Sequence, residues 1–453
     1  MAADGESGRV GRMGGRALLV DLYELTMAQS YLDEGLGERP ATFSMYARHL
    51  PGGWRYFVAA GLDEALRALE ELRFTDDDLA YLESTDLFTA PLLERLGRLR
   101  FSGEVRALPE GTLFFPDEPL LEVTGPVLEA QLLETVLLNV LHLNSLLASK
   151  AARSVDAAQG RLLVEFGLRR EHGGDAGLAA ARSSYLAGFD STSNVLAGKL
   201  YGIPIAGTMA HSFVEAFADE LEAFRAFARA YPDRCTLLVD TYDTVEGARR
   251  AAVVARELAE QGHRLHGVRL DSGDLVELSR RVRAVLDEAG FPDAMVFASG
   301  NLDEEEIERL LAAGAPIGGF GVGSRLGTSA DAPYLDLAYK LVAFDGRPVL
   351  KLSQGKATWP SAKQVFRVEE GGRFSHDVIG LADEPPPAGA RPLLETVMSG
   401  GRRLVRGTLA EARERCAAER RSLPARPYEV RFSPALGDLR EQVSADARRR
   451  HGL

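Results

Sequence analysis

The sequence predicts an α/β protein with a TIM-like barrel and a second domain of α+β type. From Arg161 onward, short β-branched apolar runs alternate with stretches of helical apolar spacing, and repeated βα units build a parallel sheet. Nearly every one of these runs ends in polar or glycine residues. The C-terminal loops of a barrel converge on one face and carry its active site, which gives this pattern.

Six strands and three helices are predicted in the barrel region. The strand count alone leaves a barrel and an open doubly wound sheet as alternatives, and the six polar strand ends favour the barrel. Asp303 stands at an N-cap position, with Glu306 three residues later as in a capping box. The predicted strands are 162–166, 203–207, 236–240, 265–270, 295–298 and 317–322, and the predicted helices are 245–261, 275–289 and 303–313.

The remaining segments have the α+β texture of a second domain. Helices are predicted at 27–32, 62–72 and 131–152, strands at 41–48, 105–108, 120–123, 340–344 and 349–352, a loop at 385–392, and an arginine-rich helical tail after it. The domain boundaries follow from these changes of texture. We predict a flexible leader at 1–16, an N-terminal α+β domain at 17–130, the α/β barrel at 131–345, and a C-terminal segment at 346–453 that returns to the α+β domain.

Composition narrows the class of function. The chain has 453 residues and a formal net charge of −13, which opposes non-specific binding to nucleic acid or to an anionic membrane. No apolar run approaches the roughly 18 residues needed to span a bilayer, and residues 1–16 lack the apolar core of a signal peptide. With two cysteines, Cys235 and Cys416, and no CxxC motif, neither a disulfide framework nor a zinc site is indicated. We expect a cytoplasmic enzyme.

Phosphate and ribose chemistry is indicated by the strand-end loops. Glycines at 319–324 follow a late strand, where successive N–H groups commonly hold a phosphate, although a tight turn is the alternative. Asp271 and Asp240 each stand at a strand end, where a carboxylate can hold ribose hydroxyls or reach a diphosphate-bound Mg²⁺ through water. For Asp274 an N-cap role is favoured, and for Asp243 the two roles are equally weighted.

Two further strand ends carry a cation and a nucleophile. Arg169 follows the first barrel strand in an acidic protein, and an arginine there can pair bidentately with a carboxylate or a phosphate. His211 lies four residues after Gly207. A histidine at a strand end is more often a hydrogen-bonding residue, but its imidazole is also a competent nucleophile toward a phosphoryl group.

Read together, several motifs resemble those of the nicotinate phosphoribosyltransferase family. The matching segments are 20–27, 165–170, 188–198, 207–211, 268–274, 321–324 and 351–363, in order from about residue 20 to about residue 367. The match departs at Trp359-Pro360-Ser361, where the family commonly has a glycine after proline. The resemblance implies an irregular TIM-like α/β barrel beside an α+β domain formed by the N-terminal and C-terminal segments, and a homodimer with shared active sites.

The resemblance also implies the reaction and its cofactors. Nicotinate and 5-phosphoribosyl 1-diphosphate (PRPP) would give nicotinate mononucleotide and pyrophosphate, a step of NAD biosynthesis by salvage. ATP would be a co-substrate whose hydrolysis is coupled through a phosphohistidine, and Mg²⁺ would bind mainly through the diphosphate, with Asp240 as a further contact.

Roles for individual residues follow from the same resemblance. His211 would be the phosphorylated histidine, and Asp271 and Arg169 would act in catalysis. The nicotinate-binding residues would be Tyr23 (from the other subunit), Phe166, Arg169 and Thr208. The PRPP-binding residues would be Ser191, Asp271, Ser272, Gly273, Gly300, Gly321, Gly323, Ser324 and Thr358, although Ser191 is better interpreted as a helix cap.

Two other functions were weighed against this one. A related phosphoribosyltransferase for quinolinate would need a more basic pocket than one centred on Arg169, and one for nicotinamide would not need that arginine's charge. A non-catalytic nucleotide-binding protein could keep the barrel, but it would have no use for a nucleophilic His211. Nicotinate is therefore the favoured substrate.

Overall fold

The computed structural model describes residues 17–353 and 358–452, so the predicted leader at 1–16 lies outside the described residues. The chain divides into two compact units. One unit is Ser149–Pro333, and the other combines the segments before and after it. No helix in the described part of the chain is both long enough and apolar enough to cross a membrane.

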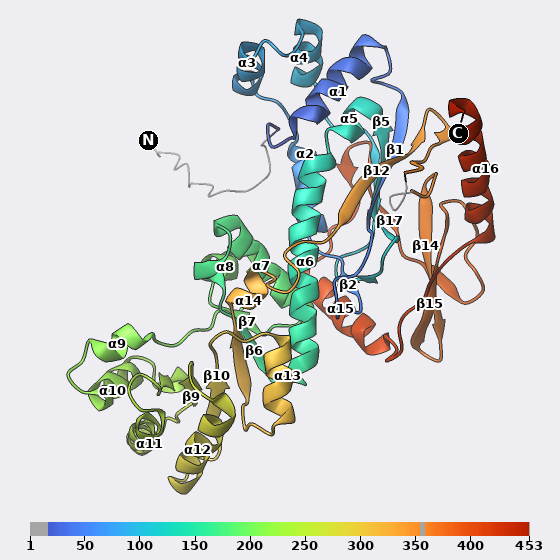
Figure 1. The fold of residues 1–453 in the computed structure, drawn as a ribbon. Helices are drawn as coiled ribbons and strands as arrows, with labels where there is room; N and C mark the ends of the chain where they lie inside the picture. Colours follow the sequence, from blue (N-terminus) through green and yellow to red (C-terminus); the bar gives the residue numbers. More distant parts are fainter. Residues whose placement is uncertain (1–16, 354–357, 453) are drawn as a thin grey trace. The chain divides into compact units, whose positions relative to one another are not determined.

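The unit Ser149–Pro333 is built on a parallel sheet (Figure 1). Its six strands run in the order β7-β6-β11-β10-β9-β8, and every pairing is parallel. The strands are β6 (Leu162–Glu165), β7 (Ser191–Thr192), β8 (Thr236–Leu238), β9 (Gly267–Leu270), β10 (Met295–Ala298) and β11 (Gly319–Val322). The predicted parallel sheet is confirmed.

The predicted strand at 203–207 is reduced to a bridge. Ile205 forms a single parallel bridge with Thr192, the last residue of β7. Pro204, next to Ile205, has no N–H to donate to a longer ladder. Within residues 17–353 and 358–452 no ladder joins this segment to β8, so hydrogen bonding does not close the sheet into a complete barrel. The coarse α/β class was correct, whereas closure of the barrel stays a prediction.

Helices connect these strands and cover the sheet. Four of them begin at aspartates whose carboxylates accept backbone N–H groups: Asp219 before α10, Asp243 before α11, Asp274 before α12 and Asp303 before α13. The helices are α7 (Gly174–Ala187), α8 (Val195–Tyr201), α9 (His211–Glu215), α10 (Glu220–Ala230), α11 (Thr244–Glu260), α12 (Leu275–Glu288), α13 (Glu304–Ala312) and α14 (Ser324–Gly327), with the short 3₁₀ turns η1 (Leu168–Arg170) and η2 (Pro232–Arg234). The three predicted helices agree with α11, α12 and α13.

The other unit contains a seven-stranded antiparallel sheet in the order β13-β12-β1-β5-β3-β17-β18. Its strands are β1 (Pro40–Ala47), β3 (Glu104–Ala107), β5 (Pro119–Pro126), β12 (Leu337–Phe344), β13 (Arg347–Pro348), β17 (Glu395–Ser399) and β18 (Arg402–Arg403). The strand predicted at 349–352 was wrong: the chain turns at Asp345 and Gly346, both with positive φ, and pairing with β12 ends at Pro348.

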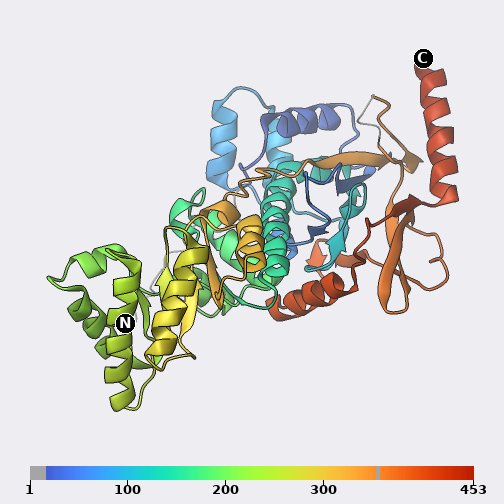
Figure 2. The same ribbon diagram turned by 60° about the horizontal axis from the view of Figure 1, so that its bottom comes forward.

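Two smaller sheets and eight helices complete this part of the chain. The C-terminal helix α16 (Pro434–His451) contacts β15 (Arg373–Leu381), and both ribbon views show this helix, in red, running to the C-terminus (Figures 1 and 2). The small sheets consist of β2 (Phe57–Val58) and β4 (Leu113–Phe114), and of β14 (Lys363–Glu370), β15 (Arg373–Leu381), β16 (Ala390–Pro392) and β19 (Val430–Phe432). The helices are α1 (Leu22–Asp33), α2 (Leu62–Glu71), α3 (Asp76–Ser84), α4 (Ala90–Gly97), α5 (Val127–Gln131), α6 (Glu134–Ala158, which ends in the other unit), α15 (Leu409–Ser422) and α16 (Pro434–His451).

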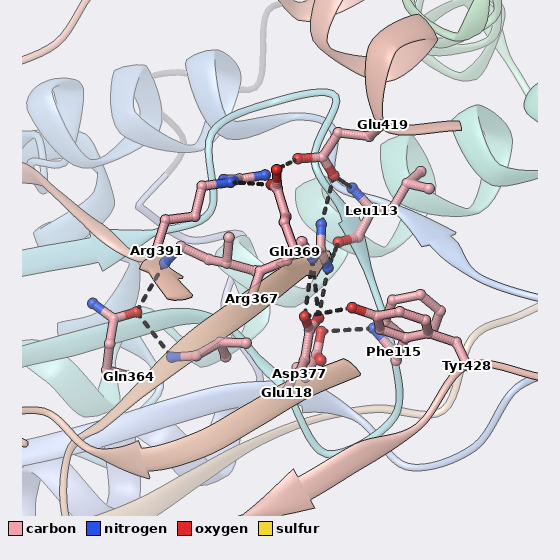
Figure 3. A network of polar contacts seen from close by, with 12 residues as sticks. Leu113, Phe115, Glu118, Gln364, Arg367, Glu369, Asp377, Arg391, Glu419 and Tyr428 are labelled. Atoms are coloured by element: carbon pink, nitrogen blue, oxygen red, sulfur yellow. Dashed lines mark hydrogen bonds and ion pairs between the residues drawn. The ribbon is translucent and has the colours of Figure 1, made fainter. Parts of the chain in front are cut away.

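A buried ionic network explains why the four-stranded sheet was not predicted. Arg367 in β14 is fully buried and donates to Asp377 at 2.6 and 3.0 Å, to Glu419 at 2.7 Å and to the Leu113 carbonyl at 2.8 Å (Figure 3). The Tyr428 hydroxyl donates to Asp377 at 2.7 Å. Charged side chains on the inner face of a sheet break the alternation of apolar and polar residues that marks a strand.

Candidate active site

The carboxyl ends of the parallel strands bring most of the predicted site residues to one edge of the sheet. Parallel strands end on the same side, so the loops that follow them are neighbours. Phe166 and Arg169 follow β6, Asp240 follows β8, Asp271, Ser272 and Gly273 follow β9, Gly300 follows β10, and Gly323 and Ser324 follow β11, whose own third residue is Gly321.

Hydrogen bonds between the loops hold the carboxylates of this edge. Asp240 Oδ2 accepts the Asp271 N–H at 2.9 Å and the Ser272 hydroxyl at 2.6 Å. Ser299 donates its hydroxyl to Asp271 Oδ1 at 2.5 Å. The other oxygen of Asp240, Oδ1, is buried without a hydrogen-bond partner. Asp240 therefore organises the loop after β9 through one of its two oxygens.

A buried arginine connects this network to the loop 207–211. Arg269 in β9 has a side chain that is only 13% exposed, and its guanidinium lies 4.0 Å from Asp271 Oδ1. It also donates to the Thr208 hydroxyl. Burial lowers the pKa of Arg269, and repulsion by Arg169 acts in the same direction, while Asp271 and Asp240 oppose it. Arg169 therefore lies near enough to Arg269 for their charges to repel, and an anion bound beside both would relieve this repulsion.

His211 is the first residue of α9, half-buried, with Nδ1 3.1 Å from the Thr241 hydroxyl. Thr241 follows Asp240 directly after β8, so the histidine is held beside the carboxylate network. The loop 207–211 thus contacts the ends of two strands, through Thr208 at β9 and through His211 at β8.

The glycine loop after β11 packs directly on the segment after β6. The Phe166 N–H donates to the Val322 carbonyl at 2.8 Å, and Arg170 donates to the Ser324 hydroxyl at 3.1 Å. A Cβ added to Gly321 would lie 2.5 Å from the Phe166 ring, and one added to Gly323 would lie 2.9 Å from the Phe166 carbonyl oxygen. Glycine is needed here because the two loops are in contact.

Gly300 meets a stricter requirement. Its φ of +93° lies in the region that favours glycine, and an added Cβ would collide with the backbone carbonyl of Asp271. The turn after β10 can therefore press against the loop after β9 only with glycine at this position. The close contact keeps Asp271 at the edge of the site.

Comparison with known proteins agrees with this arrangement. Residues 18–142 match the model of the nicotinate phosphoribosyltransferase N-terminal domain, and residues 162–366 match that of the nicotinate phosphoribosyltransferase family. A nicotinate phosphoribosyltransferase (pncB2) of Mycobacterium tuberculosis is 51% identical over 86% of this chain and 83% of its own length, and one of Bacillus subtilis is 43% identical over 81% and 76%. The crystal structure of the human nicotinic acid phosphoribosyltransferase matches with a TM-score of 0.84 and 34% identity over 93% of this chain and 99% of that one.

The chain belongs to the nicotinate phosphoribosyltransferase family. The resemblance deduced from the motifs is therefore confirmed, and with it the prediction of an enzyme. Family membership does not by itself assign a role to each residue of the site.

The structure corrects the local role of Ser191 and settles that of Asp243. Ser191 is not a helix cap: it lies in β7, buried, paired with Val164. The cap of α8 is Asn194, which accepts the Ala197 N–H at 3.0 Å. Asp243, left open between two roles, caps α11 by accepting the Glu246 N–H at 2.8 Å.

Tyr23 and Thr358 belong to the other unit, and each is placed within it. Tyr23 lies on α1 and is 45% exposed; burial raises the pKa of its hydroxyl, and the neighbouring Glu134 and Glu24 add to this rise. Thr358 is buried and accepts the Lys351 N–H at 2.9 Å through its hydroxyl.

The departure from the family pattern at Trp359-Pro360-Ser361 has a simple geometry. Ser361 has a φ of +68°, a left-handed conformation that glycine adopts most easily. The glycine expected here from the resemblance would adopt this conformation at lower cost than serine. In this chain serine adopts the same conformation, and its carbonyl accepts a hydrogen bond from Lys363 at 2.8 Å.

Sequence reasoning missed several residues that shape the site. Arg269 carried a usable signal, because an arginine inside an otherwise apolar strand needs a buried partner. Thr241 and Ser299 carried none, since their contacts join segments that are distant in sequence: Thr241 lies 30 residues from His211, and Ser299 lies 28 residues from Asp271.

Proposed function

We propose that this member of the family transfers the 5-phosphoribosyl group of PRPP to nicotinate, giving nicotinate mononucleotide and pyrophosphate in the salvage of NAD. The observation that carries the proposal is the convergence of opposite charges at one sheet edge: Arg169 and Arg269 beside Asp240 and Asp271. The substrates require this combination, because nicotinate and PRPP are anions and the ribose carries hydroxyls. The identity to named nicotinate phosphoribosyltransferases supports the same reaction.

Nicotinate would bind through its carboxylate to Arg169, with the Thr208 hydroxyl and the Phe166 backbone as further contacts. Arg269 positions Thr208 by donating to its hydroxyl and adds a second positive charge to the pocket. Nicotinamide lacks the negative charge that two arginines favour, and quinolinate would bring a second carboxylate beside Asp271. Nicotinate therefore suits the pocket best.

PRPP would occupy the loops after β9, β10 and β11. The ribose 5-phosphate would lie against the glycine loop at Gly321, Gly323 and Ser324, where Arg170 already donates to the Ser324 hydroxyl. Gly300, Ser272 and Gly273 would line the same pocket, and Asp271 would accept hydrogen bonds from the ribose hydroxyls. Ser191 and Thr358 would make further contacts with PRPP.

The residues that converge here suit the chemistry of the transfer. The pyridine nitrogen attacks C1′ with its own lone pair, so the reaction needs no general base. As the bond to pyrophosphate breaks, positive charge develops on the ribose and negative charge on the leaving group. Asp271 can stabilise the former and the arginines and phosphate loops the latter, which is catalysis by preorganised electrostatics.

Mg²⁺ fits the donor set as an ion held mainly by the diphosphate. No group of three or more His, Cys, Asp or Glu side chains suited to a metal occurs among the described residues. Asp240 can add one ligand, because its buried Oδ1 has no hydrogen-bond partner and Mg²⁺ prefers carboxylate oxygens. When bound, the ion would neutralise charge on the diphosphate.

ATP would enter as a co-substrate through His211. The contact of Nδ1 with Thr241 fixes the ring and makes Nε2 the nitrogen that faces a phosphoryl donor. In that step Nε2 bonds to the γ-phosphorus as the bond to ADP breaks, and later hydrolysis releases phosphate. A phosphate on His211 would add negative charge near the diphosphate site and change its affinity for donor and product.

A homodimer with shared active sites belongs to the same proposal, with Tyr23 of one subunit stacking on the pyridine ring bound by the other. The irregular barrel and the α+β domain formed by both chain ends are proposed on the same ground. A cytoplasmic location is consistent with the two cysteines, Cys235 and Cys416, which are buried free thiols.

One assay tests the reaction. The purified protein is incubated with PRPP, Mg²⁺ and ATP together with nicotinate, nicotinamide or quinolinate, each alone, and the products are identified by mass. We expect nicotinate mononucleotide from nicotinate and little product from the other two. Absence of mononucleotide from nicotinate, or faster formation from nicotinamide or quinolinate, would contradict the proposal.

A further inference from the structure

Two glutamates bracket the segment that carries Arg169. Glu165 is the last residue of β6, and Glu171 follows η1 directly. Glu165 is fully buried; its Oε2 accepts the Thr192 hydroxyl at 2.6 Å, and its Oε1 accepts the Gly167 N–H. The carboxyl group of Glu165, at the end of β6, thus connects β7 with the start of the segment 166–170.

Glu171 turns its carboxyl group back toward Glu165. Both of its oxygens are buried, and neither has a hydrogen-bond partner among the described residues. An added Cβ on Gly167 would lie 2.9 Å from Glu165 Oε1 and would collide with Glu171 Oε1, so the two carboxyl groups border the same small space.

Glycines on two further elements make room for Glu171. A Cβ on Gly177 in α7 would lie 2.8 Å from its Oε2, and one on Gly327 in α14 would lie 2.5 Å from its Oε1. Three glycines therefore leave the space that this carboxyl group fills between the segment, α7 and α14. Because α14 begins at Ser324, the Glu171 side chain lies next to both the turn 166–170, which carries Arg169, and the glycine loop 321–324.

Two adjacent buried carboxyl groups cannot both be ionised at low cost. Burial, and then the charge of Glu165, raise the pKa of Glu171 to about 8. Burial also raises the pKa of Glu165, but the hydrogen bonds from Thr192 and Gly167 oppose that rise. At neutral pH the pair therefore holds one proton, on Glu171, whose neutral carboxyl group lies beside the Glu165 carboxylate.

The other charged groups on the surrounding elements do not replace this proton. They are Arg169, Arg170 and His172 beside Glu171, Asp175 and Arg182 on α7, and Arg325 on α14. Arg170 donates to Ser324, and Arg325 pairs with Asp303 at 2.6 Å. Among charged groups, it is Glu165 that shifts the pKa of Glu171.

We propose that Glu171, packed against Glu165 in the space left by Gly167, Gly177 and Gly327, is a positioning residue that fixes the turn 166–170 and thereby presents Arg169 to the substrate carboxylate. The inference rests on the proposed nicotinate-binding role of Arg169. Loss of the proton places two negative charges in one buried space, and the turn that separates them must move. Affinity for nicotinate then falls, while the chemical step, which depends on the loops after β8 and β9, changes less.

Glu171→Gln provides the test, because a neutral amide of the same shape fills the same space beside Glu165 and cannot ionise. We expect the KM for nicotinate of the wild-type enzyme to rise about tenfold per pH unit above pH 8, with kcat changing little. The KM of E171Q should stay flat over the same range. The surface variant Glu308→Gln, on α13, serves as the matched control and should follow the wild type.

Thermal unfolding gives a second readout that needs no catalysis. A carboxyl group with a raised pKa in the folded state stabilises the fold fully below its unfolded pKa of 4.5 and loses this contribution as the pH rises to about 8. The Tm advantage of E171Q over the wild type should therefore grow between pH 5 and pH 8 and then level off.

The outcomes separate the two proposals. If E171Q shares the KM rise of the wild type, or if its Tm advantage does not depend on pH, the positioning role of Glu171 is wrong even though nicotinate is the substrate. If the wild type forms no mononucleotide but the Tm advantage grows with pH, the acid pair is upheld and the assignment of nicotinate fails.

Discussion

At the scale of single residues, Arg269 decides how the site is held together. It is buried in β9, touches Thr208 and lies 4.0 Å from Asp271, so one guanidinium connects the predicted nicotinate pocket with the predicted ribose pocket. A buried arginine that bridges two loops in this way contributes through geometry as well as charge. Its partner Arg169, which is exposed on η1, carries the charge into the pocket.

We predict that Arg269→Gln lowers kcat/KM for nicotinate by about 10²- to 10³-fold, which corresponds to about 3–4 kcal/mol of lost transition-state stabilisation. The glutamine is neutral and cannot hold Thr208 and Asp271 together. Steady-state kinetics with nicotinate and PRPP measure the effect. Arg309→Gln, on the surface of α13 where Arg309 pairs with Glu306, is the matched control, and a loss of equal size there would show that the effect is not local.

At the scale of elements, the four-stranded sheet depends on Arg367. Its guanidinium is buried among carboxyl groups of β15 and α15 (Figure 3). Glu118 adds a third carboxyl group, fully buried, whose pKa burial raises well above the ordinary range, so that it is neutral. The negative charges of Asp377 and Glu419 are compensated inside the protein only while the Arg367 cation is present.

We predict that Arg367→Ala lowers the free energy of unfolding by about 3–5 kcal/mol, because Asp377 would lose its buried cation and Glu419 would keep only the half-exposed Arg391. Urea denaturation followed by circular dichroism measures it. The control is Arg391→Ala, which also removes a partner of Glu419 but has a side chain that is 47% exposed, and it should cost about 0–1 kcal/mol. Equal costs for the two variants would contradict the assigned role of the network.

The same network shows how far elements can be predicted from sequence. The strands β9, β10 and β11 and the helices α11 to α13 have regular apolar spacing, and their predicted ends agree with the structure within three residues. The strands β14 and β15 were missed because Arg367 and Asp377 occupy buried positions that the pattern assigns to solvent. The strand at 203–207 was overestimated because Pro204 lacks a donor.

The site could be predicted in the same uneven way. Strand ends pointed to Asp240, Asp271, Arg169 and His211, because parallel strands must end at one edge. The pairing of Glu165 with Glu171 could not be seen, since it depends on space left by glycines in three different elements. Contacts of this kind are decided by packing and leave no periodic signal in the sequence.

At the scale of the whole molecule, an acidic chain gathers its cations locally. The net charge is −13, yet Arg169, Arg170 and Arg269 lie at the carboxyl edge of one sheet. Anionic substrates are therefore attracted to that edge and not to the surface at large. The same edge holds His211, so the residue proposed to take phosphate from ATP lies beside the loops proposed to bind the diphosphate.

The ratio of ADP to nicotinate mononucleotide formed shows whether this edge couples ATP use to phosphoribosyl transfer through His211. We expect about one ADP per mononucleotide in the wild type. We also expect an acid-labile phosphate on the wild-type protein. His211→Asn should lose both, while the surface control His263→Asn, which removes only the contact with Asp233, should keep them. An H211N protein that still forms ADP in step with mononucleotide, or still carries the acid-labile phosphate, would contradict the account.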